Sequence, residues 1–291
     1  MKSPRKICRI GLIQTPVSED PSANLKKTLL KIKEAAARKA KIICLQELFR
    51  TRYFCQGHDA RNFDLAEPVP GPTTRALSKA ARQAGAVIIA PIFERRARGV
   101  YHNSAAVIDA DGSLLGLYRK MHIPDDPFFY EKFYFTPGDL GFKTFKTRYG
   151  KIGVLICWDQ WFPEAARLTA LSGAGIIFYP TAIGAHDSEP LKTVRCQLEG
   201  WQIAQRGHAV ANAVFVAAAN RVGREGPVKF WGHSFVADPF GAMIAEAGEK
   251  DAEVLIADCD LSRIEETRRS WPFLRDRRVD AYPPLLSRFL E

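Results

Sequence analysis

The chain has 291 residues, of which 46% are hydrophobic and 25% charged, a composition typical of globular proteins that excludes disordered, collagen-like and coiled-coil chains. No apolar run approaches the roughly 18 residues of a membrane span, and the basic N-terminus lacks the apolar region of a secretory signal, so we expect a cytoplasmic protein. The formal net charge of +10 is scattered along the chain, so no nucleic-acid or membrane partner is expected; steeply salt-dependent retention on heparin would contradict this.

Short apolar, β-branched segments punctuated by turn residues predict strands along the whole chain. In chain order they cover residues 7–14, 41–47, 87–93, 104–108, 114–119, 151–157, 175–179, 214–220, 234–238 and 253–258. Helical spacing predicts helices over 22–39, 73–84, 163–172 and 191–212. Hairpin turns are expected at 111–112 and 239–241. Strands separated by helices and mixed with hairpins indicate an α/β protein.

A degenerate internal repeat refines this fold prediction. The segment RIGLIQTP, a helix and KIICLQEL have the same order as KIGVLICWD, a helix and AGIIFYPTA. Two similar strand-helix-strand units predict two sheets packed face to face, with helices on the outer faces. Because no linker rich in Pro, Gly or Ser divides the chain, we expect residues 1–291 to form a single domain with a C-terminal arm from about residue 263.

Three polar residues stand where predicted apolar strands end: Glu47, Lys120 and Cys157. A turn and a helix follow Cys157, and backbone N–H groups at a helix start favour a thiolate. A cysteine nucleophile needs a base to relay protons and a cation to hold an oxyanion, which Glu47 and Lys120 can supply. The six cysteines form no CxxC pair, so neither a disulfide framework nor a zinc site is expected.

The blocks LQELF, YRKMHIP and CWDQWFPE around these residues resemble the signature blocks of the nitrilase, or carbon-nitrogen hydrolase, superfamily. The resemblance extends from residue 10 to the tail and implies a four-layer α-β-β-α sandwich with a Glu47, Lys120 and Cys157 triad. It also implies that Glu131, which matches an additional glutamate of the family, holds Lys120 and the substrate amide in place. No cofactor or metal is implied.

The longer stretches YRKMHIPDDPFFYEKFYFTPGD and QRGHAVANAVFVAAANRVG are similar to the branch containing N-carbamoylputrescine amidohydrolases. The similarity implies hydrolysis of N-carbamoylputrescine to putrescine, ammonia and carbon dioxide through a thioester on Cys157, with Lys120 and the Trp158 N–H holding the oxyanion. It implies a homo-oligomer, a dimer or higher, whose C-terminal arm packs on a neighbour. Phe128, His233 and Val279 depart from the branch pattern. Phe128 replaces a glycine and is expected to affect which substrate fits.

A substrate with a terminal ammonium requires carboxylates and aromatic faces at the far end of the pocket. The candidates to bind this substrate are Tyr53, Asp125, Asp126, Phe129, Tyr130, Trp158 and Glu189. A substrate with a carboxylate would instead require Arg or His. The dispersed histidines are expected to be structural, with His122 bracing the segment after Lys120.

Several alternatives stay open from the sequence. The chain could hydrolyse another N-carbamoyl compound, in the manner of a β-ureidopropionase or an N-carbamoyl amino acid amidohydrolase, or it could be an ω-amidase or a nitrilase. A non-catalytic binding protein on the same fold is the alternative from a different class. The presence of Glu47, Lys120 and Cys157 together argues against that last possibility.

Overall fold

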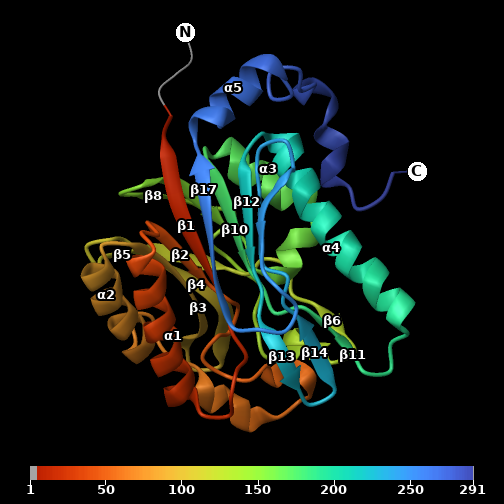
Figure 1. Cartoon of the computed structure of the whole chain (residues 1–291). Helices are drawn as coiled ribbons and strands as arrows, with labels where there is room; N and C mark the ends of the chain where they lie inside the picture. The colour runs from red at the N-terminus through yellow and green to blue at the C-terminus, as the bar shows by residue number, and fades with distance from the viewer. Residues whose placement is uncertain (1–4, 291) are drawn as a thin grey trace.

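The computed structural model describes residues 5–290 and forms a four-layer sandwich (Figure 1). One six-stranded sheet has the order β17-β1-β2-β3-β4-β5 and the other has the order β16-β15-β12-β10-β9-β8. Helices α1 and α2 lie on one side of the two sheets, and α3 and α4 lie on the other side. The predicted α-β-β-α sandwich is therefore confirmed.

The strands of the first sheet are β1 (Ile7–Gln14), β2 (Ile42–Leu45), β3 (Val87–Ala97), β4 (Val100–Ile108), β5 (Leu114–Arg119) and β17 (Glu253–Asp260). Those of the second are β8 (Thr144–Thr147), β9 (Gly150–Val154), β10 (Ile176–Pro180), β12 (Phe215–Ala219), β15 (Phe235–Ala237) and β16 (Met243–Glu246). The helices are α1 (Pro21–Ala37), α2 (Pro72–Ala84), α3 (Pro163–Leu171), α4 (Leu191–Asn212) and α5 (Ser262–Ser270). None of the described helices is long and apolar enough to cross a membrane.

Side chains that alternate between the two faces of the first sheet contribute to two hydrophobic cores, one on each face. Ile42 and Cys44 of β2 belong to the core between the sheets, whereas Ile43 and Leu45 belong to the core beneath α1 and α2. Successive side chains of a strand point to opposite faces, so a strand buried on both sides is apolar throughout. Burying each such side chain contributes about 1.5–3 kcal/mol.

The predicted repeat corresponds to two strand-helix-strand units, one in each sheet. Strands β1 and β2 are parallel and joined by α1, and β9 and β10 are parallel and joined by α3. The last strand, β17, pairs antiparallel with β1 over its whole length, from Gln14 opposite Glu253 to Ile7 opposite Asp260. The first sheet is therefore completed by the end of the chain.

Several short elements were not predicted from the sequence. The hairpin strands β6 (Asp125–Asp126) and β7 (Phe129–Tyr130) form a sheet of their own, and β11 (Gly184–His186), β13 (Val222–Glu225) and β14 (Val228–Trp231) form another. Six 3₁₀ helices cover Phe54–Gln56, Ala60–Leu65, Glu131–Phe133, Cys157–Trp161, Val279–Ala281 and Pro283–Leu286. The two small sheets and two of these helices surround the candidate site.

Candidate active site

Lys120 lies at the centre of a buried ion cluster just after β5. Its Nζ donates to Oε2 of Glu131 at 2.6 Å and to Oε1 of Glu47 at 3.0 Å. Asn103 Nδ2 donates to the same Glu47 oxygen at 2.7 Å, and the Tyr53 hydroxyl donates to Oε1 of Glu131 at 2.7 Å. All five side chains are buried. The fold therefore joins four of the residues that the sequence nominated: Glu47, Tyr53, Lys120 and Glu131.

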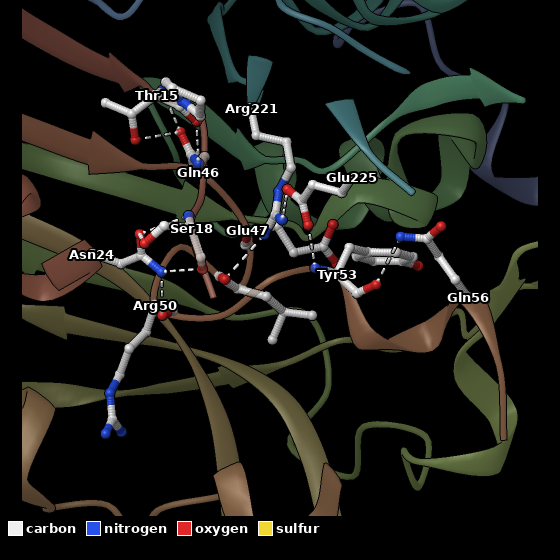
Figure 2. A network of polar contacts seen from close by, with 12 residues as sticks. Thr15, Ser18, Asn24, Gln46, Glu47, Arg50, Tyr53, Gln56, Arg221 and Glu225 are labelled. Atoms are coloured by element: carbon white, nitrogen blue, oxygen red, sulfur yellow. Dashed lines mark hydrogen bonds and ion pairs between the residues drawn. The ribbon is translucent and has the colours of Figure 1, made fainter. Parts of the chain in front are cut away.

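The backbone that presents Glu47 is fixed by a buried ion pair from the second half of the chain. Arg221, between β12 and β13, donates through Nη2 to the carbonyl oxygens of Glu47 and Leu48 at 2.8 and 3.0 Å. Its Nη1 donates to Glu225 at 2.7 Å, and Glu225 accepts the Tyr53 N–H at 2.6 Å (Figure 2). Leu48 has a positive φ of 46°, a strained conformation that persists where its surroundings over-determine it.

The other oxygen of Glu47 is available for chemistry. Oε2 is buried and has no hydrogen-bond partner within residues 5–290. A buried carboxylate oxygen without a donor is costly in a structural role. It suits a group that must accept a proton from a nucleophile.

Cys157 occupies a tight turn after β9, with a positive φ of 43°. The buried carboxylate of Asp159 accepts hydrogen bonds from the Ile156 N–H at 2.9 Å, the Tyr118 hydroxyl at 2.7 Å and the His122 N–H at 3.0 Å. The His122 ring nitrogen Nδ1 lies 2.7 Å from the same carboxylate. Asp159 therefore holds the turn in place, and His122 braces it from the segment after β5.

The charges of the cluster are strongly coupled. Burial acts to lower the pKa of Lys120, but the carboxylates of Glu131 and Glu47 outweigh it, so this pKa lies well above its usual value. Lys120 is therefore a cation at neutral pH. Burial raises the pKa of Glu131 to about 7, although Lys120 opposes the shift.

Cys157 differs from the sequence-based expectation of a thiolate. Burial raises the pKa of its thiol well above the usual value and the charge of Glu47 adds to the rise, whereas Lys120 and a hydrogen bond from the Ala182 backbone oppose it. The helix that begins at Cys157 is a short 3₁₀ helix, which provides a weaker field than a long α-helix. The raised pKa keeps Cys157 a neutral thiol, which would require a base to act as a nucleophile.

A cavity of about 680 Å³ opens on Cys157. Aromatic rings form much of its wall, namely Phe128, Phe129, Trp158, Trp161 and Trp231. The carboxyl groups on the wall are those of Asp126, Glu131 and Glu189. Among the described residues that line the cavity, none is Lys or Arg and one is a histidine, His186, whereas the buried Glu47 and Lys120 are not on the wall. The wall therefore suits a cation better than a carboxylate.

The β6–β7 hairpin divides the predicted substrate residues between its two faces. Asp126 pairs with Phe129, and Asp125 pairs with Tyr130. Paired residues of antiparallel strands share a face, and neighbours along a strand alternate. Asp126 and Phe129 line the cavity, whereas Asp125 and Tyr130 do not. The expectation that Asp125 and Tyr130 bind substrate is therefore corrected.

The remaining predicted substrate residues differ in their placement. Trp158 and Glu189 line the cavity. Both oxygens of Glu189 already accept hydrogen bonds, from the His186 N–H at 2.9 Å and from Gln197 Nε2 at 2.6 Å. Tyr53 is not on the cavity wall, and its hydrogen bond to Glu131 makes it a support of the ion cluster.

Sequence reasoning missed Asn103, Asp159 and Arg221. Arg221 follows an apolar strand directly, which is the same signal that identified Glu47, Lys120 and Cys157. Asn103 stands directly before the predicted strand 104–108, and its partner Glu47 becomes visible only in the folded structure. Within residues 5–290, no three His, Cys, Asp or Glu side chains are grouped to hold a metal ion.

Residues 9–269 match the family described as carbon-nitrogen hydrolase. The chain therefore belongs to the carbon-nitrogen hydrolase family, as the signature blocks predicted. It is 47% identical to the N-carbamoylputrescine amidase of Arabidopsis thaliana, over 96% of this chain and 95% of that protein. It is 41% identical to the citrullinase of Francisella tularensis, over 97% of this chain and 99% of that protein.

A solved structure agrees with the architecture. The crystal structure of a carbon-nitrogen hydrolase from Helicobacter pylori superposes with a TM-score of 0.95 and 45% sequence identity. The match covers 98% of this chain and 100% of that chain. The similarity therefore includes the segments that carry the candidate site.

Proposed function

We propose that this enzyme hydrolyses N-carbamoylputrescine to putrescine, ammonia and carbon dioxide. The observation that carries the proposal is the cavity over Cys157, which combines carboxylates and aromatic rings and has no Lys or Arg on its wall. N-carbamoylputrescine has a ureido group at one end and an ammonium at the other. The similarity to the amidase of Arabidopsis thaliana supports this substrate.

The first half of the proposed reaction forms a thioester. Cys157 Sγ attacks the ureido carbon while its proton passes to Glu47, whose Oε2 is free to accept it. The carbonyl oxygen becomes an oxyanion, which Lys120 Nζ and the Trp158 N–H stabilise, each donor contributing about 3–4 kcal/mol. The intermediate then expels ammonia, which takes the proton from Glu47.

The second half releases the amine. Glu47 takes a proton from water, which attacks the thioester carbon, and the thiolate leaves and recovers the proton. The product is a carbamate that decomposes to putrescine and carbon dioxide. Glu131 keeps Lys120 in position throughout, because it bonds both the ammonium and the Tyr53 hydroxyl.

Citrulline is the most informative rival substrate because it has the same ureido group and an ammonium but adds a carboxylate. A buried or half-buried carboxylate needs a cationic partner. Among the described residues the cavity wall has no Lys or Arg, and its one histidine, His186, is stacked on Phe128 and accepts the Ser188 N–H through Nδ1. This observation favours N-carbamoylputrescine over citrulline, despite the similarity to the citrullinase of Francisella tularensis.

We also propose that residues 1–291 form one catalytic domain whose arm, from about residue 263, packs on another subunit of a homo-oligomer. Large apolar side chains of this arm are exposed, including Trp271 at 52%, Leu286 at 93% and Phe289 at 84%. Exposed apolar surface of this kind marks an interaction site. The six free cysteines support a reducing compartment such as the cytoplasm.

Ammonia release from a substrate panel tests the proposed activity. The panel contains N-carbamoylputrescine, citrulline, N-carbamoyl-β-alanine, an ω-amide and a simple nitrile, with the Cys157→Ala variant as the blank. We expect the highest kcat/KM for N-carbamoylputrescine. A preference for either carboxylate-bearing ureido compound would overturn the substrate assignment and leave the thioester chemistry intact.

A further inference from the structure

Phe128 makes an unusual contact at the wall of the cavity. It lies in the turn between β6 and β7, and its ring stacks on that of His186 at the end of β11, with ring centroids 3.9 Å apart and planes 9° from parallel. Both residues line the cavity that contains Cys157. The stack therefore joins the β6–β7 hairpin to the segment between β11 and α4.

The backbone conformation at Phe128 favours glycine and not phenylalanine. Its φ is 67°, in the left-handed region that glycine adopts without strain and bulky residues adopt at a cost. A residue needed only for the turn would be glycine, so the ring has a role beyond the turn. Such outliers cluster at ligand sites, where the surrounding contacts hold them.

His186 is a fixed platform for this ring. The Ser188 N–H donates to its Nδ1 at 3.1 Å, and the Ser188 Oγ lies 2.7 Å from the same nitrogen. The His186 N–H donates to Glu189, which is also held by Gln197. The ring under Phe128 is therefore held in place by its own segment.

The stack lies between two carboxylates of the cavity wall. Asp126 precedes Phe128 in the same hairpin, and Glu189 is bonded to His186. Cys157 lines the same cavity from the turn after β9, and Glu131 lines it directly after β7. The stack therefore belongs to the part of the wall that carries Asp126 and Glu189, whose carboxylates suit a terminal ammonium.

We propose that Phe128, stacked on His186, forms the distal end of the cavity, where a substrate chain that starts at Cys157 finishes, and that it restricts ureido substrates to short, unbranched chains that end in a cation. This inference rests on the proposed function and names Phe128 as a specificity-determining residue of the same site. A longer chain would meet the ring, and a citrulline carboxylate would be placed against rings and carboxylates. A misfit of one methylene group changes kcat/KM by about tenfold or more.

The test measures kcat/KM for N-carbamoyl derivatives of linear diamines with four, five and six carbons, and for citrulline. The variants are Phe128→Gly and Phe128→Ala, which both remove the ring, and Phe128→Tyr, which keeps it. Of the two ring-deleted variants, only the alanine variant retains the backbone strain, so we expect Phe128→Gly to melt about 2 °C above Phe128→Ala. His186→Phe preserves a stacked ring and His186→Ala removes it.

The proposal expects the preference for the four-carbon substrate over the six-carbon substrate and citrulline to fall about tenfold or more in both Phe128→Gly and Phe128→Ala. Phe128→Tyr should retain the wild-type preference. Unchanged ratios in the two ring-deleted variants would overturn the proposal. A change in Phe128→Ala alone would also overturn it, because that pattern reports backbone strain.

The same data separate this inference from the proposed function. If the wild-type enzyme cleaves citrulline better than N-carbamoylputrescine, the substrate assignment fails. The dependence on chain length in the Phe128 variants still tests whether the ring limits the distal end.

Discussion

The two ends of the cavity are built in different ways. At the reactive end, Glu47 and Glu131 are fully buried and both bond Lys120. Glu47 and Lys120 follow strands β2 and β5 of the sandwich, and Glu131 follows the β6–β7 hairpin. At the proposed distal end, Asp126 is exposed and Phe128 is half-buried, and both belong to that hairpin, which has two-residue strands. Charges act strongly where water is excluded and weakly where it is present. We therefore expect chemistry to depend on the buried end and selectivity on the exposed one.

The largest effect should come from removing the nucleophile at the buried end. We expect Cys157→Ala to reduce kcat by about a millionfold, as loss of a catalytic nucleophile does in other hydrolases. Ammonia release measures the loss, and an unchanged melting temperature serves as the control for folding. Appreciable turnover by this variant would exclude a thioester mechanism.

The next effect concerns stability. Lys120→Met leaves the carboxylates of Glu47 and Glu131 buried without their cation, so we expect a loss of about 3–5 kcal/mol in the free energy of unfolding. Urea unfolding measures this change. Lys132→Met is the matched control, because Lys132 is exposed in the neighbouring segment. A loss below about 1 kcal/mol would mean that the cluster is not coupled as described.

The raised pKa of Glu131 should make the free energy of unfolding depend on pH. Its carboxyl holds a proton up to about pH 7 in the folded state, against its ordinary value of 4.5 in the unfolded state. Between these values the folded state binds the proton and the unfolded state does not, so stability falls as pH rises, by about 1–3 kcal/mol. Urea unfolding at pH 5 and 7.5 should show this fall in wild type and a smaller one in Glu131→Gln. Equal slopes would contradict it.

The smallest effect is expected at the exposed end. Asp126→Asn should raise KM for N-carbamoylputrescine about fivefold with little change in kcat, because one partly solvated charge is lost. Asp125→Asn is the matched control on the opposite face of the same hairpin. Steady-state kinetics with a neutral amide should show no change in either variant. An equal response to both substitutions would remove the distinction between the two faces.

The same division explains how much the sequence could predict. The strands around Glu47, Lys120 and Cys157 are apolar for several residues and end in a polar one, so the sequence could predict the sandwich, which is confirmed, and nominate these three residues, whose catalytic role stays a prediction. Strands as short as β6 and β7 leave no alternation to read, so the facing of Asp125 and Asp126 could not be assigned. The neutral state of Cys157 depends on burial by distant segments.

The role of Arg221 could not be predicted from the sequence for a different reason. It follows a predicted strand, but its partners are the carbonyl oxygens of Glu47 and Leu48, in the turn after β2 of the other sheet. Every residue has a backbone carbonyl oxygen, so the sequence does not show which of them accepts a hydrogen bond from Arg221. Only the packing of the two sheets shows that Arg221 fixes the backbone at Glu47.

The pairing of β17 with β1 has a consequence for how the protein is made. During synthesis β1 leaves the ribosome long before β17, so the outer edge of β1 stays uncovered until β17 has been made. Until then β1 presents unpaired backbone groups, which makes an incomplete chain prone to edge-to-edge association. Contacts between residues so distant in sequence also slow folding. A chain cut before Glu253 would therefore aggregate even though every residue of the reactive end is present.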